Sequence, residues 1–426
     1  MKIKHKIEQI VPYAKTKFLF IPFLILYIGI VILFSKSEFQ GDETRYISFA
    51  NNLLNGFYSP PPPNINLWNG PGYPIVLIPY LFLKLPLIAI KLSNAFFLYF
   101  SLILFNKSLS LYVKKNIAFS FSIILGSYIP FFAYLHLILT EIFTIFLITL
   151  LTYFLCLTLS IQGARSFRIY ITYFITSFIL SYLAMTKIVF GYVILTCIIL
   201  FSLIYIIFKS IELKKLIIIF LLALVFCFPY LTYTYHLTGK FFYWGNSGGY
   251  SLYWMSNPNE NEFGDWHPPN LHNHPVLIKN HKEFFEEISE LTSIKKDEAL
   301  KKKAIQNIIN HPKKYFMNWL ANIGRMLFSY PYSYVPLTSF LRKFAVIIPN
   351  MFILVFSIFL IYPTFKFMNQ IPLEILALLI FGSIYFLGSS LISTFARQFF
   401  PIVPLILLWF AYMFDRFLKI QLKYSA

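Results

Sequence analysis

Residues 188–208, IVFGYVILTCIILFSLIYIIF, contain no charged side chain. An α-helix rises about 1.5 Å per residue, so a run of this length crosses the roughly 30 Å hydrocarbon layer of a bilayer. Backbone amides inside lipid have no water to bond, and a helix satisfies them within one segment. The run also lacks the alternation of a barrel strand. It therefore predicts a transmembrane helix.

Similar apolar runs recur along the chain and predict an all-α polytopic membrane protein. The sequence is 58% hydrophobic and only 12% charged, with a mean hydropathy of +0.67, whereas soluble domains carry about 25% charged residues. No small-residue cleavage site follows the first run, which predicts an uncleaved span. We expect about ten spans, near residues 18–34, 92–108, 116–135, 141–160, 168–186, 188–208, 216–235, 344–364, 372–392 and 398–415.

The formal net charge of +19 is concentrated in the short loops between apolar runs. This placement follows the positive-inside rule and argues against nucleic acid as a partner. Two apolar stretches, 72–86 and 316–335, are short or interrupted by proline or arginine. If both lie at the outer interface as amphipathic helices, nearly every basic short loop is cytoplasmic. We therefore expect a multi-pass protein of a bacterial inner membrane.

This topology divides the chain into three parts. We expect residues 1–235 to form an N-terminal transmembrane module with an outer loop at 36–91. Residues 236–342 form a small, mostly helical extracytoplasmic segment, with a helix near 297–311 that Asp297 opens and Pro312 follows. Residues 343–426 form the C-terminal transmembrane helices.

The first outer loop contains Gly41-Asp42-Glu43-Thr44-Arg45-Tyr46. Helical spacing of apolar residues follows, and Gly56 is a stop signal. The pattern predicts an amphipathic helix on the membrane surface, with Tyr46, Phe49, Ala50, Leu53 and Leu54 on its apolar face. Asp42 could be an N-cap and Glu43 a favourable charge for the helix dipole. Alternatively, both carboxylates belong to a functional site.

Three further ionisable residues are expected at the outer ends of spans: Glu141, Lys187 and Arg397. Ionisable residues that face a membrane bundle are functional candidates. The alternative is that they are interface residues in water or snorkelling anchors. Carboxylates near a low-dielectric interface are expected to have raised pKa values, which suits a general base.

Seven sequence motifs occur in order along the chain. The 41–46 motif is followed by Pro71-Gly72-Tyr73-Pro74, Lys91-Leu92-Ser93-Asn94, Thr140-Glu141 and Met185-Thr186-Lys187. The last two are the segment Gly248–Trp254 and Ala396-Arg397-Gln398-Phe399, which stands before Pro401 and Pro404. Together they resemble the GT-C superfamily of polyprenyl-phosphate-sugar-dependent glycosyltransferases, especially protein O-mannosyltransferases and bacterial aminoarabinose transferases. Two positions depart from the pattern. Asn69-Gly70 stands where relatives carry a basic residue, and Lys187 replaces an arginine.

The resemblance implies a membrane glycosyltransferase that acts on the extracytoplasmic face by inverting single displacement. It implies a polyprenyl-phosphate-sugar donor, a glycan, lipid or protein acceptor, and membrane lipid as surroundings. No cofactor is expected, although a divalent metal could bind a carboxylate. Asp42 would be the base, with Glu43 and Glu141 also catalytic. The implied substrate-binding residues are Arg45, Tyr46, Tyr73, Lys187, Tyr250, Trp254 and Arg397.

Two residue types invite a metal or disulfide interpretation. His267, His272, His274 and His281 lie close together, and histidine is a common zinc ligand. Loose spacing and the lack of nearby cysteine favour a solvated loop, which could bind the acceptor. The three cysteines, which lie far apart inside apolar runs, favour buried hydrophobic positions over disulfides; they are Cys156, Cys197 and Cys227.

Two other classes of membrane protein remain open. A transporter or flippase of lipid-linked saccharides would place charged or Pro/Gly-broken spans near mid-membrane. An O-antigen polymerase or ligase would depend on Arg and His residues of late outer loops and not on Asp42. The gathering of acids and bases at the outer ends of spans favours the transferase.

Overall fold

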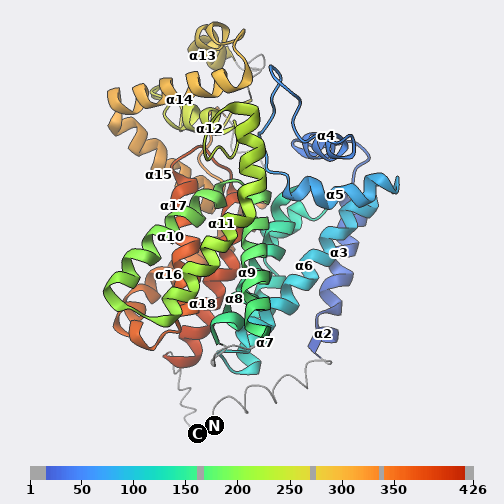
Figure 1. Cartoon of the computed structure of the whole chain (residues 1–426), viewed down its shortest axis with the longest axis vertical. Helices are drawn as coiled ribbons and strands as arrows, with labels where there is room; N and C mark the ends of the chain where they lie inside the picture. Colours follow the sequence, from blue (N-terminus) through green and yellow to red (C-terminus); the bar gives the residue numbers. More distant parts are fainter. Residues whose placement is uncertain (1–15, 161–166, 269–274, 335–339, 418–426) are drawn as a thin grey trace.

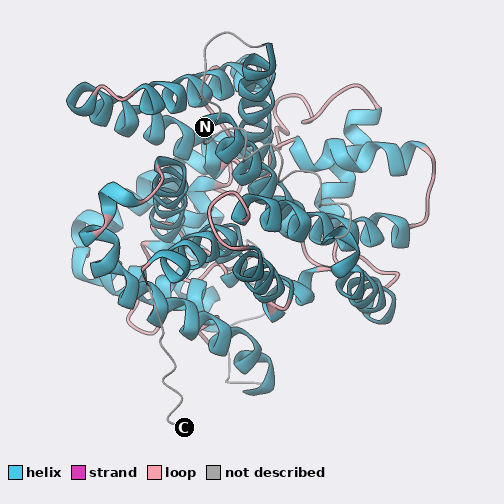
Figure 2. Ribbon diagram, turned by 90° about the horizontal axis from the view of Figure 1, so that it is seen from below, coloured by secondary structure: helices cyan, strands magenta, loops and turns pink. Residues whose placement is uncertain are grey.

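The computed structural model describes residues 16–160, 167–268, 275–334 and 340–417, and every regular element in these ranges is a helix (Figure 2). Eight helical segments are long and apolar enough to cross a membrane. This confirms the predicted all-α polytopic fold. The segments are α6 (Leu87–Leu109), α8 (Thr140–Ser160), α9 (Phe167–Thr186), α10 (Val189–Phe208), α11 (Ile211–Thr238), α16 (Phe340–Lys366), α17 (Leu373–Ser390) and η5 (Ala396–Ile402) continued by α18 (Val403–Arg416).

The number of spans differs from the ten expected. A ninth candidate is the pair α7 (Lys115–Gly126) and η2 (Ile129–Tyr134), whose two parts are bent by 43°. The first apolar run is broken into α2 (Thr16–Leu19) and α3 (Ile21–Phe34). The 14 residues of α3 reach only about 21 Å, which is less than the hydrocarbon thickness. The described ranges therefore hold eight or nine candidate spans.

The bundle has a buried centre and an apolar outside. In α8 and in the η5–α18 segment, 72% and 78% of the apolar window is buried, whereas in α16 only 17% is. Large apolar side chains of α16, such as Phe352 and Phe359, are exposed. Soluble proteins rarely expose apolar patches larger than a few hundred Å². A lipid-facing surface accounts for these side chains.

The shorter helices gather at one end of the bundle (Figure 1). The 11 residues of α5 extend about 17 Å, too short to cross a bilayer, and α15 is not among the candidate spans of the described chain. Both observations fit the interfacial arrangement of residues 72–86 and 316–335. The gathered helices are α4 (Glu43–Leu54), α5 (Gly72–Phe82), α12 (Gly248–Met255), α13 (Pro275–Glu287), α14 (Ser293–Asn310) and α15 (Pro312–Phe328).

Basic residues mark the opposite end of the bundle (Figure 1). Successive long helices alternate in direction, so the turns that begin α7 and α11 and the ends of α16 and α18 lie at that end. These positions carry Lys114, Lys209, Lys366 and Arg416. The charge asymmetry between the two ends is the one that the positive-inside rule describes.

Helix α4 forms where the sequence predicts it. Tyr46, Phe49 and Ala50 are buried, and the helix ends just before Gly56, whose φ of +87° suits glycine. Asp42 stands at the N-cap position, but its backbone is already helical and its side chain makes no capping hydrogen bond. The N-cap explanation of Asp42 is therefore wrong.

Helix α14 begins at Ser293, earlier than the predicted start at Asp297. Asp297 lies one turn inside the helix, fully buried, where it accepts a hydrogen bond from the Gly249 amide at 2.6 Å. It thus satisfies an amide of the first turn of α12 instead of capping its own helix. Pro312 begins α15 directly after α14, as expected for a helix end.

Candidate functional site

A cavity of about 520 Å³ lies between the bundle and the gathered short helices. Four charged residues that the sequence predicts to share one face line it together. Asp42 precedes α4, Glu141 is in the first turn of α8, Lys187 lies in the turn between α9 and α10, and Arg397 is in η5. The fold brings Asp42 and Arg397 into contact across 355 positions of sequence.

The Asp42 carboxylate is held between two arginines. Its Oδ1 lies 2.8 Å from Nη2 of Arg45, and its Oδ2 lies 2.8 Å from Nη2 of Arg397. Burial would raise the pKa of Asp42, but the charges and hydrogen bonds of Arg397 and then Arg45 hold it below its usual value. The expectation of a raised pKa is therefore wrong for this residue. Asp42 is ionised at neutral pH.

Glu141 forms the second acidic point of the site. Its side chain is only 3% exposed, and its Oε1 lies 3.3 Å from Nζ of Lys187 and 3.7 Å from Nε of Arg397. Lys187 also donates to Oε1 of Gln398 at 3.3 Å. The other oxygen of Glu141, Oε2, is buried with no hydrogen-bond donor in the described part of the chain. That oxygen can accept a hydrogen bond from a ligand.

The charges of this cluster do not cancel. Arg45, Lys187 and Arg397 face the carboxylates of Asp42 and Glu141, which leaves one net positive charge. Partial burial lowers the local dielectric and strengthens each interaction. The site therefore favours a ligand with one negative charge.

Lys187 gives the site an alkaline limit. Burial lowers the pKa of its ammonium group, although Glu141 opposes the shift. If the charged form is needed for activity, activity falls as pH rises, beginning below the usual lysine range. We expect Lys187→Arg to keep activity at neutral pH within about tenfold and to remove this limb, because arginine does not titrate there. Rate profiles of both proteins from pH 7 to 10 check this, and an unchanged limb in the variant would contradict it.

Glu43 is not in the cavity wall. It is fully buried, and its two oxygens accept hydrogen bonds of 2.6 Å from the backbone amides of Ile138 and Gln40. Nζ of Lys91 lies 3.9 Å from its Oε1 and donates to the Lys36 carbonyl. Glu43 therefore links the backbone at Gln40, just before Asp42, to the backbone at Ile138, in the loop that leads to Glu141.

Asn94, on α6, forms hydrogen bonds with the same loop. Its Nδ2 donates to the carbonyl oxygens of Leu135 and Leu137, at 3.1 and 2.8 Å. The Lys91–Asn94 motif is thus structural: it fixes the backbone just before Thr140-Glu141. Buried hydrogen bonds of this kind restrict where the loop, and with it the Glu141 side chain, can lie.

The proline turn packs tightly on the end of α9. A Cβ atom on Gly70 would lie 1.9 Å from the Met185 carbonyl oxygen, and one on Gly72 would lie 2.5 Å from Oγ1 of Thr186. Only glycine permits this approach. The turn places Asn69 in the cavity wall, where it bonds both the Arg45 guanidinium and the Tyr46 hydroxyl.

Besides Glu43, four of the residues implied by the resemblance do not line the cavity: Arg45, which contacts Asp42 from outside its wall, and three aromatic residues. Tyr73 is buried behind Tyr46, with ring centroids 5.3 Å apart. Trp254 is 1% exposed and packs on His281. Tyr250 packs against Trp68 at 5.2 Å. Tyr46 does line the cavity.

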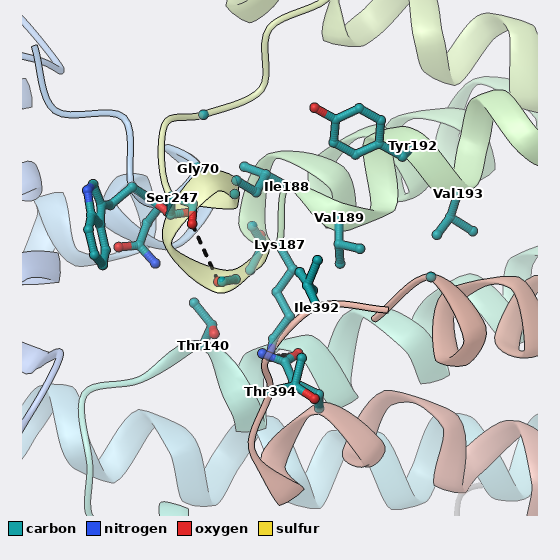
Figure 3. Close-up of a pocket in the computed structure, with 18 of the residues that line it drawn as sticks. Gly70, Thr140, Lys187, Ile188, Val189, Tyr192, Val193, Ser247, Ile392 and Thr394 are labelled. Carbon is teal, nitrogen blue, oxygen red and sulfur yellow. Dashed lines mark hydrogen bonds between the residues drawn. The ribbon is translucent and has the colours of Figure 1, made fainter. Parts of the chain in front are cut away.

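One side of the cavity is apolar. It consists of one face of α10 and the facing part of α17 (Figure 3). Sequence reasoning missed this groove, because an apolar residue in a span looks the same whether it faces lipid or a cavity. The mainly apolar lining consists of Ile188 just before α10, Val189, Tyr192, Val193 and Thr196 of α10, Ile384 and Gly388 of α17, and Ile392 beyond it.

Several polar lining residues were also missed. Gln398 follows Arg397 directly and bridges Lys187 to the Tyr385 hydroxyl, so its motif was the available signal. Lys301 also lines the cavity, where its Nζ lies 2.5 Å from Oδ2 of Asp297. The i, i+4 spacing of Asp297 and Lys301 was its signal.

The histidines of the short-helix end are explained in part. His281 is buried and contacts Glu262 and the Tyr253 hydroxyl at 2.8 Å each, and although burial opposes it, this histidine lowers the pKa of Glu262. His272 and His274 lie outside the described residues. Within the described ranges, no group of three or more His, Cys, Asp or Glu side chains could hold a metal ion. The three cysteines are buried, and none of them forms a disulfide bond in the described part of the chain.

Comparison with known proteins gives one structural likeness. The sequence matches no protein-family model and no curated protein. The chain is similar to ArnT from Cupriavidus metallidurans, whose crystal structure was determined bound to undecaprenyl phosphate. The two are 11% identical, and the match covers 91% of this chain and 76% of that chain with a TM-score of 0.42. At this distance the likeness carries no functional argument.

Proposed function

We propose that this chain is a GT-C-type membrane glycosyltransferase, which transfers a sugar from a polyprenyl-phosphate donor to a hydroxyl group of an acceptor. The observation that carries the proposal is the position of Asp42. This ionised carboxylate lies in a cavity that joins an apolar groove beside α10 and α17 to the cations Lys187 and Arg397, while Arg45 contacts it from outside the cavity wall. A lipid-linked phosphate sugar has the same three parts: an apolar chain, one negative charge and a polar ring.

The donor phosphate binds at Lys187 and Arg397. A phosphodiester carries one negative charge, which matches the net positive charge of the cluster. The polyprenyl chain then follows the apolar groove of α10 and α17 toward the membrane. Arginine and lysine contacts to phosphate are charge-assisted hydrogen bonds, which are stronger than neutral ones. The same contacts stabilise the charge that develops on the leaving phosphate.

The transfer is a single displacement. The acceptor oxygen attacks the anomeric carbon, the bond from that carbon to the phosphate oxygen breaks, and its electron pair leaves with the phosphate. Asp42 accepts the proton of the acceptor hydroxyl. Attack opposite to the leaving group inverts the configuration.

Arg397 couples donor binding to the base. In the structure it bonds Oδ2 of Asp42 at 2.8 Å. When the donor phosphate competes for this guanidinium, one carboxylate oxygen of Asp42 becomes available to the acceptor. Glu141, with its unpaired buried Oε2, orients a hydroxyl group of the donor sugar or of the acceptor.

The site faces the extracytoplasmic side of a cell membrane in this proposal. The basic ends of the bundle, such as Lys209 and Arg416, would be cytoplasmic by the positive-inside rule. The short helices lie at the other end (Figure 1), and the cavity is lined by residues beside them, such as Asp42 before α4 and Gly248 of α12.

Blocking the apolar groove tests the donor site. Gly388 lines the groove and has open space where a Cβ would stand. We expect Gly388→Leu to weaken binding of undecaprenyl phosphate to the purified protein roughly tenfold, because the side chain fills the path of the lipid chain. Gly29→Leu is the matched control, since Gly29 also lies in a helix with open space around it but outside the cavity. Native mass spectrometry measures undecaprenyl phosphate binding by both variants. Equal binding would show that the lipid chain does not occupy the groove.

A further inference from the structure

A second cavity, of about 730 Å³, lies next to the first among the short helices and loops. It is built from Arg45 of α4, the end of the proline-rich loop, Asn246, residues Trp266 and Pro268, and the 290–296 segment that leads into α14. Its wall therefore contains no part of a candidate span. The residues used below are Arg45, Asn64, Asn66, Trp68, Trp266 and Lys296.

A thin wall separates the two cavities. Trp68 lines both, and the guanidinium of Arg45 lies 4.8 Å from the centre of its ring. Of the segment 245–247, the first and last residues line the first cavity, whereas Asn246 lines the second. Arg45 lines the second cavity and also holds Asp42. A group in the second cavity is thus separated from the base by the Arg45–Trp68 pair.

The wall of the second cavity is pre-organised. Asn246 accepts a hydrogen bond from the Leu67 amide and donates to the Ile65 carbonyl. Ser293 donates to the same carbonyl from the first turn of α14. These bonds fix the loop that carries Asn64, Asn66 and Trp68, so the ligand does not have to order it.

The chemistry of the lining suits a saccharide. Trp68 and Trp266 are half-buried and both line the cavity, with ring centroids 6.5 Å apart and planes at 84°, so ring surface of two tryptophans borders one space. Side-chain amides of Asn64 and Asn66 and the ammonium of Lys296 offer hydrogen-bond donors and acceptors for hydroxyl groups. A lipid chain would need a continuous apolar wall.

We infer that the second cavity binds the sugar end of a glycan acceptor, which makes the acceptor class a glycan instead of a lipid or a protein. The inference rests on the proposed transferase function. The acceptor hydroxyl reaches Asp42 past Arg45, gives its proton to the carboxylate, and attacks the anomeric carbon while the phosphate leaves. No further reactant is needed.

Variants of the second cavity test the inference in cells that lack the native copy. Trp266→Ala and Asn64→Trp respectively remove an aromatic face and fill the space. Each is expected to reduce sugar incorporation into surface polysaccharide roughly tenfold or more, with polyprenyl-phosphate sugar accumulating. Trp266→Phe should retain most activity. Lys296→Ala should reduce incorporation, and its exposed neighbour Lys295, changed to Ala, is the control.

Three measurements separate the possible failures. Purified Trp266→Ala and Asn64→Trp proteins should bind undecaprenyl phosphate as the native protein does, which shows that they are folded and that the donor site is intact. If both bind it and both keep full incorporation, the acceptor inference is overturned. It is also overturned if deletion of the native copy removes the sugar from lipid or protein instead of polysaccharide. Failure of Asp42→Asn to accumulate donor overturns the proposed function itself.

Discussion

Asp42→Asn is expected to lower sugar transfer by about 10²- to 10⁴-fold, the usual contribution of a positioned general base. Asparagine has nearly the same shape, so it can fill the place between Arg45 and Arg397. It cannot accept the proton of the acceptor hydroxyl. The donor phosphate would still find its cations, and the lipid-linked sugar should therefore accumulate in cells.

The same substitution should change stability only slightly. The pKa of Asp42 is held below its usual value, so its ion pairs stabilise the fold above the pKa of an unfolded aspartate. That contribution is lost only as pH falls through the lower, folded pKa. The carboxylate is 25% exposed, and solvent screening limits the cost at neutral pH to the order of 1 kcal/mol.

The measurement is lipid extraction with quantification of the polyprenyl-phosphate sugar, beside a thermal unfolding curve of the purified protein. Glu38→Gln is a matched control, because this carboxylate lies in the same loop but is exposed and outside the cavity. Unchanged transfer by a folded Asp42→Asn protein would remove the base from the mechanism. The remaining candidates would then be a transporter of lipid-linked saccharides and an O-antigen polymerase or ligase.

The charged half of the site could be predicted from the sequence, because charge is rare in this chain. Ionisable residues at the ends of spans are few, and the alternation of helices through a membrane places Glu141, Lys187 and Arg397 at one end. The structure confirms that these three meet Asp42 in one cavity. The pairing of Asp42 with two arginines, which reverses the expected pKa shift, depends on side-chain directions that spacing does not give.

The apolar half and the aromatic residues could not be predicted. In the sequence Gly388 and Val193 look like any other span residues, and only the packing of α10 beside α17 brings them to one cavity. Trp254 was a reasonable sugar-binding candidate, but α12 turns it onto His281 in the core of the short helices. The first apolar run was counted as a full span, whereas the break before Ile21 leaves a shorter helix.

Glu43→Gln is expected to act mainly through stability, which distinguishes Glu43 from its neighbour. Both oxygens of this carboxylate accept hydrogen bonds of 2.6 Å from backbone amides, and the ammonium group of Lys91 is the nearby positive charge. In glutamine, the amide nitrogen faces one of these donors and leaves it unsatisfied. Lys91, itself 1% exposed, loses its counter-charge. Removing one partner of such a buried set costs roughly 3–5 kcal/mol.

Thermal unfolding of the purified variants measures this cost. We expect Glu43→Gln to lower the unfolding temperature. The rate of sugar transfer should fall in proportion, because the loop before Glu141 is no longer held in place. Adding Lys91→Met should recover part of the stability, since the uncompensated charge is gone and the two effects are not additive in contacting residues. A Glu43→Gln protein of native stability but without transfer would instead place Glu43 in the chemistry, as the resemblance implied. Asp42→Asn therefore tests the chemistry of the site, whereas Glu43→Gln tests the structure that positions it.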